Sequence, residues 1–211
     1  RAGGGAQAQP LSAGNHAAWR MLASGTSDVT WCEETYTHSD TIAEWYNTWS
    51  NMAFLMCAWW MSVHFRNTPP LFGPVAVGAM VVQGLTSAWF HASKSLAGQM
   101  ADELCIVFIT GLSLGLFVGK VARGALASAA YTAALLIWPR WNHMILALTV
   151  PPLVVCTDLA VGWTGSHHAW KVWRRSTGWV AFSFLVWSLD IFLCRPWNTQ
   201  MHFHAMWHVS T

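Results

Sequence analysis

The chain has 211 residues, of which 54% are hydrophobic and only 9% are charged, and it contains 16 Trp. A soluble domain usually has about 25% charged residues, so this composition excludes an ordinary soluble protein and indicates a membrane protein. The net charge of +2 is small and the basic residues are scattered, which excludes nucleic acid as a partner.

The N-terminal segment, residues 1–30, is rich in Gly, Ala and Ser and has no apolar periodicity, which predicts a flexible arm. The first residue is Arg rather than Met, so we expect that a preceding segment, such as a targeting sequence, was cleaved or omitted. The rest of the chain, 31–211, is expected to form one membrane domain.

Seven apolar stretches predict membrane helices, because about 20 apolar residues cross a bilayer. They lie at about 42–65, 70–91, 101–119, 124–138, 143–161, 176–194 and 199–211. The predicted fold class is therefore all-α, a polytopic membrane protein with a bundle of seven transmembrane helices. The last stretch stops three residues past His208, so this helix is expected to be short or truncated. His167 and His168 follow Gly165 and Ser166, and are expected in a solvated loop.

Polar side chains interrupt the first apolar stretch at Glu44, Asn47 and Asn51, which share one face of a helix. Polar groups in hydrocarbon turn inward and find partners, so this face is expected to point into the bundle. Cys32 and Cys194 lie outside or at the edge of apolar stretches. They pair only if both face an oxidising compartment, and the residues alone leave this open.

Five residues form the constellation that points to chemistry. Ser87 and His91 lie four residues apart near the end of one apolar stretch, and Asp102 opens the next. His204 and His208, again four apart, share a helical face near the C-terminus. Three imidazoles hold Zn²⁺ and leave a fourth position for water, which is the arrangement of a catalytic site. Asp102 is then suited to take and return a proton, and Ser87 to donate to an oxyanion, which predicts a hydrolase for a buried ester or amide.

The same residues have simpler interpretations. A histidine at a membrane helix end is commonly an interfacial or hydrogen-bonded residue. Against this, a carboxylate at mid-membrane costs about 2.5–3.5 kcal/mol on insertion scales, so Asp102 favours a functional site. Asp190 also interrupts an apolar stretch. It is expected either to orient one of the histidines or to make a hydrogen bond between packed helices.

Six ordered blocks of residues resemble the motifs of the alkaline ceramidases. They are Trp31-Cys32-Glu33-Glu34-x-Tyr36, Glu44-x-x-Asn47-Thr48-x-Ser50-Asn51, Ser87-x-x-Phe90-His91-Ala92, Gln99-x-x-Asp102-Glu103, Trp187-x-x-Asp190-x-x-x-Cys194 and His204-Ala205-x-Trp207-His208. The blocks extend from residue 31 to residue 208, so they cover nearly the whole expected domain.

This resemblance implies a seven-helix membrane hydrolase that cleaves the amide of ceramide into sphingosine and fatty acid. It implies zinc on His91, His204 and His208, with Ser87 and Asp102 assisting. It also implies an endomembrane location in the ER or Golgi and, from the matching positions, a Cys32–Cys194 disulfide.

The family also binds calcium through a motif with Asp before the Trp-Cys-Glu-Glu block and Asn before the Tyr. Thr30 and Thr35 stand in those two places here. Calcium takes 6–8 oxygen ligands, carboxylates among them, and only Glu33, Glu44 and the carbonyl of Trp31 remain. Calcium binding is therefore expected to be weak or absent, with Glu33 in a salt bridge or at a helix start instead.

Two other classes of protein compete with the enzyme. One is a non-catalytic, ceramidase-like structural or lipid-binding subunit of a larger organellar membrane complex, which the altered calcium motif, the end of the chain at Thr211 and the many Trp residues favour. The other is a receptor of the related adiponectin and progestin receptor family. That reading gives no reason for the blocks between Trp31 and Asn51, so it ranks last.

Overall fold

The structure is a computed structural model that describes residues 22–64, 72–117, 129–130, 132–133, 167–194 and 201–211. Within these ranges the regular structure is helical and no strand occurs, which confirms the all-α class. The stretches expected at 124–138 and 143–161 lie outside the described residues, apart from the four helical positions 129, 130, 132 and 133.

The described helices are α2 (Trp45–Ser50), α3 (Met52–His64), α4 (Phe72–Ser93), α5 (Leu96–Phe117), α8 (His167–Phe192) and α9 (Phe203–Ser210). The single span expected at 42–65 is divided into α2 and α3 at Asn51. The expectation of a loop at His167 and His168 is wrong, because both lie in the first turn of α8. The apolar stretch marks only the later part of this helix, and its first turns are polar.

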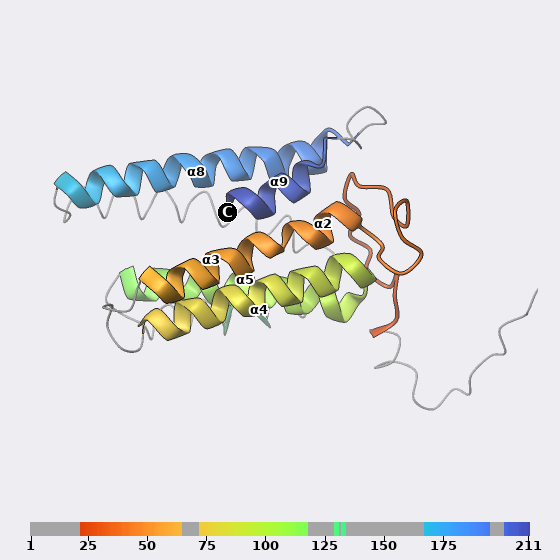
Figure 1. Cartoon of the computed structure of the whole chain (residues 1–211), viewed down its shortest axis with the longest axis horizontal. Helices are drawn as coiled ribbons and strands as arrows, with labels where there is room; N and C mark the ends of the chain where they lie inside the picture. Colours follow the sequence, from red (N-terminus) through yellow and green to blue (C-terminus); the bar gives the residue numbers. More distant parts are fainter. Residues whose placement is uncertain (1–21, 65–71, 118–128, 131, 134–166, 195–200) are drawn as a thin grey trace, which may run out of the picture.

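The helices form two groups that meet at α9. In Figure 1, α3, α4 and α5 lie side by side, and α8 runs along the opposite side of the molecule. The short helix α9 lies between them and contacts α8, α2 and α3. α2 also contacts α4. This arrangement brings the C-terminal helix next to the end of α4, although about a hundred residues separate them along the chain.

Close approach of the helices requires glycine at two positions. A Cβ atom at Gly84 of α4 would lie 3.1 Å from Cβ of Phe54 and 3.3 Å from the carbonyl oxygen of Asn51. One at Gly98, in the first turn of α5, would lie only 3.0 Å from Cα of Phe90. Small residues let helix backbones pack closely, and here they hold α3, α4 and α5 together around the end of α4.

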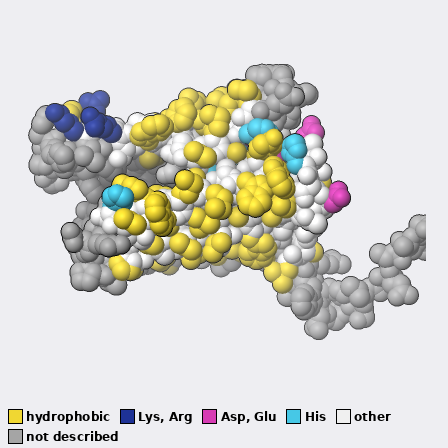
Figure 2. Space-filling view, viewed as in Figure 1, with side chains coloured by type: hydrophobic (Ala, Val, Ile, Leu, Met, Phe, Trp, Pro, Cys, Tyr) yellow, Lys and Arg dark blue, Asp and Glu magenta, His cyan; other side chains and the backbone are white. Residues whose placement is uncertain are grey.

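The exterior is apolar and much of the interior is polar, which reverses the pattern of a soluble protein. Figure 2 shows hydrophobic side chains over most of the described face, with basic side chains at one end and acidic ones at the other. Met56 is 67% exposed and Trp59 is 69% exposed, whereas Asn47 and His91 are completely buried. The expectation that Glu44, Asn47 and Asn51 face inward is confirmed, because none is more than 1% exposed.

Length and composition together identify one candidate membrane span among the described helices. It is Gly73–Ser93, which makes up nearly all of α4.

The last part of the segment expected as an arm is bound to the helices. The backbone N–H of Gly25 donates to the carbonyl of Ser93 at 3.0 Å, and that of Ser27 donates to the carbonyl of Lys94 at 2.9 Å. A disulfide between Cys32 and Cys194, with Cα atoms 5.2 Å apart, then joins the segment to the end of α8. The chain that precedes α2 is therefore attached both to the end of α4 and to the end of α8.

Candidate active site

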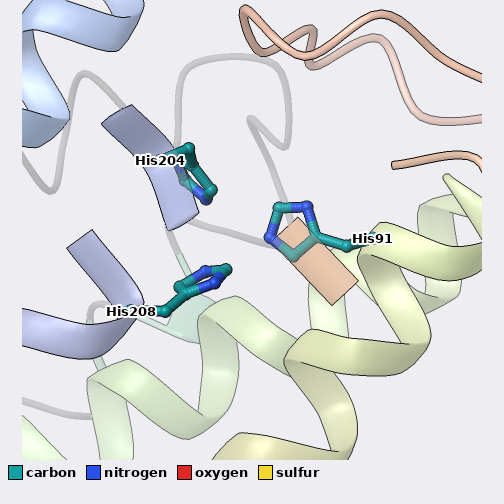
Figure 3. A group of neighbouring side chains, drawn as sticks. All are labelled: His91, His204 and His208. Atoms are coloured by element: carbon teal, nitrogen blue, oxygen red, sulfur yellow. The ribbon is translucent and has the colours of Figure 1, made fainter. Parts of the chain in front are cut away.

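Three buried histidines lie together where α4 and α9 meet. His91 occupies the last turn of α4, and His204 and His208 follow each other by one turn on α9. One ligand nitrogen from each ring lies within 4.8 Å of the other two. Figure 3 shows the three imidazoles turned toward one shared space. Their exposed fractions are 0%, 4% and 4%, so all three rings are buried.

Hydrogen bonds fix two of the rings from the side away from this space. Nδ1 of His91 lies 2.5 Å from Oε2 of Glu44, and Nδ1 of His208 lies 2.7 Å from Oγ of Ser50. Such bonds set the tautomer of a metal-binding histidine and leave its Nε2 lone pair for the ion. The ring of His204 has a different support, since it stacks on Trp31 with centroids 3.7 Å apart.

The three rings fit a metal ion. Nε2 of His91 and Nδ1 of His204 are buried without a hydrogen-bond partner among the described residues. A buried polar atom without a partner is costly, so these nitrogens require a ligand that the protein itself does not supply. Three imidazoles with one open position are the donor set of a catalytic zinc centre.

A cavity of about 220 Å³ adjoins the histidines. Ser87 and Asp102 line it together with His204 and His208, so the structure brings all five residues of the expected constellation into one place. Hydrophobic side chains make up much of the remaining wall, among them Phe54, Met80, Ile106, Ile109, Phe184, Trp187 and Trp207.

Asp102 is held by two polar neighbours on α4. Nε2 of Gln83 donates to its Oδ1 at 2.6 Å, and Ser87 makes a second side-chain hydrogen bond to the carboxylate. Gln83, Ser87 and His91 follow one another at four-residue intervals, so a single face of α4 presents all three. The hydroxyl of Ser87 is therefore directed to the carboxylate in this structure.

Asp190 supports the backbone rather than an imidazole. Its Oδ2 accepts a hydrogen bond from the backbone N–H of Cys32 at 3.2 Å, and its carboxylate also interacts with the backbone N–H of His204. It is 1% exposed. Asp190 thus joins the N-terminal segment, α8 and the start of α9, and it positions His204 through the main chain.

The carboxylates expected at the calcium motif are already engaged. Glu33 accepts hydrogen bonds from the backbone N–H groups of Tyr46 at 2.7 Å and Asn47 at 2.8 Å, so the expectation that it lies at a helix start is confirmed. Oε1 of Glu44 lies 2.7 Å from Nζ of Lys94, and its Oε2 contacts His91. These residues do not fit a calcium ion, because backbone N–H groups bond to both oxygens of Glu33 and the carboxylate of Glu44 is already paired with the positive charge of Lys94.

Sequence reasoning missed three partners of the site. Gln83 had a usable signal, since it precedes Ser87 by four residues on the same helix. Ser50 stood in a motif block, but nothing in its spacing connects it to His208. Lys94 follows His91 by three residues, and only the fold shows that its side chain reaches Glu44.

Geometry and burial together define a helical protein with a buried three-histidine centre beside a mainly apolar cavity. The family model described as "Ceramidase" matches residues 23–211. The chain is 29% identical over 211 residues to "Alkaline ceramidase" of Drosophila melanogaster, covering 91% of this chain and 75% of that protein. It is 23% identical to "Alkaline ceramidase 3" of Mus musculus, over 88% of this chain and 79% of the relative. It is also 36% identical to "Alkaline ceramidase 1" of Mus musculus, over 42% of this chain and 34% of the relative. The chain belongs to the alkaline ceramidase family.

Proposed function

We propose that this protein is a zinc-dependent intramembrane amidase that hydrolyses ceramide to sphingosine and a fatty acid. The observation that carries the proposal is the group of three buried histidines, two of them with an unpartnered ring nitrogen, next to Ser87 and Asp102. The names of the relatives support the choice of ceramide as substrate.

His91, His204 and His208 would hold the zinc ion, with Glu44 and Ser50 fixing two of the rings. A zinc ion held by these residues would supply a water acidic enough to act as the nucleophile near neutral pH. Asp102 is placed on the cavity wall to accept a proton from the attacking water and to give it to the leaving amine nitrogen. That transfer returns the carboxylate to its starting state.

Ser87 is suited to donate a hydrogen bond to the substrate carbonyl oxygen as negative charge develops on it. A hydroxyl has only one proton to donate, and in this structure Ser87 directs it to Asp102. We infer that the hydroxyl turns from Asp102 to the carbonyl oxygen when substrate binds. The hydrogen bond from Gln83 then remains to hold the carboxylate.

The apolar exterior and the candidate span in α4 support a membrane protein. We propose that it is multi-pass, with seven membrane helices and an endomembrane location. The cavity, at about 220 Å³, is smaller than the roughly 300–1,000 Å³ of most small-molecule sites. It suits the amide and the adjoining carbon atoms, while the two alkyl chains extend along the apolar helices toward lipid.

The decisive experiment measures zinc and turnover on the same preparation. The detergent-solubilised protein is dialysed extensively, its metal content is measured by elemental mass spectrometry, and release of fatty acid from ceramide is then assayed. One zinc per chain with turnover supports the proposal. Folded protein without zinc would favour the non-catalytic subunit, and zinc without turnover would redirect the search to another amide or ester.

A further inference from the structure

The side chain of Lys94 contacts both the N-terminal segment and Glu44, the residue that holds the ring of His91. It lies between α4 and α5 and is only 6% exposed. Its Nζ is 2.7 Å from Oε1 of Glu44 and donates to the carbonyl oxygen of Val29 at 2.7 Å. The ammonium also lies 5.0 Å from the centre of the Phe90 ring. A carboxylate, a carbonyl and an aromatic face therefore surround one buried positive charge.

The backbone of Lys94 adopts a conformation that ordinarily favours glycine. Its φ is +52°, and its N–H donates to the carbonyl of Phe90 at 2.6 Å as α4 ends. Glycine is the usual residue in this left-handed position after a helix, since any Cβ there is unfavourable. The backbone conformation therefore does not account for a lysine at this position, whereas the contacts of its ammonium group with Glu44 and Val29 do.

We propose that the Lys94 ammonium is the resident cation of this site and replaces a bound calcium ion. It neutralises Oε1 of Glu44, which leaves Oε2 to hold Nδ1 of His91. In this way Lys94 acts as a positioning residue: it keeps the His91 ring turned toward the other two histidines without any added metal.

The charges in the site explain why the lysine and calcium exclude each other. Calcium needs 6–8 oxygen ligands. The carbonyl of Val29 and Oε1 of Glu44 are both taken by the ammonium, and both oxygens of Glu33 accept backbone hydrogen bonds. A divalent cation beside Glu44 would also lie close to the positive charge of Lys94 in a buried environment, where repulsion is strong.

The first test measures calcium binding by the unmodified full chain. The protein is dialysed in buffer that a chelating resin has depleted of calcium and that contains zinc. Calcium content and the unfolding midpoint Tm are then measured with and without added CaCl2. We expect no stoichiometric calcium and no change in Tm. One calcium per chain, or a clear rise in Tm on adding calcium, would overturn the proposal whether or not any variant folds.

The second test separates the charge of Lys94 from its backbone conformation. Lys94→Met keeps the length of the side chain and removes the charge, and Lys94→Gly removes the charge but suits the left-handed backbone. We expect both to lower Tm by about 10 °C, because each leaves Glu44 buried without its cation. The exposed Lys171→Met is the matched control and should leave Tm unchanged. A Lys94→Gly protein as stable as the unmodified one would show that the lysine serves only the turn.

The third test asks whether Lys94 acts on the metal centre, and this part rests on the proposed function. Zinc release to a chromogenic chelator is expected to be about tenfold faster in Lys94→Met than in Lys171→Met, since the support of His91 is weakened. Equal release rates would overturn the positioning role. If the unmodified protein holds no zinc, the proposed function fails, whereas calcium content and Tm still decide whether Lys94 is the resident cation.

Discussion

The protein contains two polar clusters that share Glu44 and differ in what they leave open. At the three histidines, ring nitrogens on His91 and His204 have no hydrogen-bond partner among the described residues. At the other cluster, backbone N–H groups bond to both carboxylate oxygens of Glu33, and the carboxylate of Glu44 is ion-paired with Lys94 and contacts His91. Burial is nearly complete in both. The difference teaches that burial alone does not identify a metal site, because a buried ligand atom can already be neutralised by a cationic side chain of the protein itself.

The largest effect is expected from removing one of the three clustered histidines. His208→Ala leaves two imidazoles, which are too few to retain zinc in competition with a chelator. Zinc content and ceramide hydrolysis should both fall to background while helicity, measured by circular dichroism, is kept. The exposed His64→Ala is the matched control. An active His208→Ala protein would contradict the whole mechanism.

A large but incomplete loss is expected from Asp102→Asn. The amide has nearly the shape of the carboxylate but cannot carry a proton from water to the leaving nitrogen. Turnover should fall by about 10²–10⁴-fold with zinc content unchanged. The exposed Asp40→Asn should have neither effect. Loss of zinc along with activity would instead make Asp102 part of the metal site.

A smaller effect is expected from removing the hydrogen-bond partner of His208, the hydroxyl of Ser50. Ser50→Ala removes the hydroxyl that lies 2.7 Å from Nδ1, so the ring is less firmly held. Zinc affinity, measured by competition with a chelator, should fall by roughly tenfold. Ser62→Ala, at an exposed position of α3, provides the comparison. Unchanged affinity would show that packing alone orients His208.

The smallest effect is expected from a change at Glu33, and it concerns only the stability of the fold. Glu33→Gln weakens two charge-assisted hydrogen bonds to the backbone of α2, worth about 1–2 kcal/mol, so Tm should fall by about 3–6 °C. Calcium should not alter Tm in either protein. The exposed Glu34→Gln should match the unmodified protein. A calcium-dependent difference between Glu33→Gln and the unmodified chain would reopen the calcium site.

Much of this arrangement could be predicted from the sequence because helical spacing reports which side chains share a face. The four-residue interval between His204 and His208 places both toward the cavity, and the inward face of Glu44, Asn47 and Asn51 was confirmed. The start of α8 at His167 was not predictable from hydropathy, because its first turns are polar.

Contacts between segments that lie far apart along the chain could not be predicted from the sequence. Asp190 was expected either to orient an imidazole or to bond between helices, and it binds the backbone of Cys32 across 158 positions of the chain. The side chain of Lys94 reaches Glu44 only because α4 and α2 pack together. Spacing along one helix carries no information about such pairs.

The disulfide between Cys32 and Cys194 has a consequence for sidedness. A disulfide persists in an oxidising lumen or outside the cell and is rare in the reducing cytosol. Trp31, the neighbour of Cys32, stacks on His204, so the bond and the histidines belong to the same end of the molecule. The disulfide thus links this end of the molecule to an oxidising compartment. For the proposed function we therefore expect a ceramide whose head group lies in the leaflet on the oxidising side to reach the three histidines directly, and one in the opposite leaflet to need to cross the membrane first.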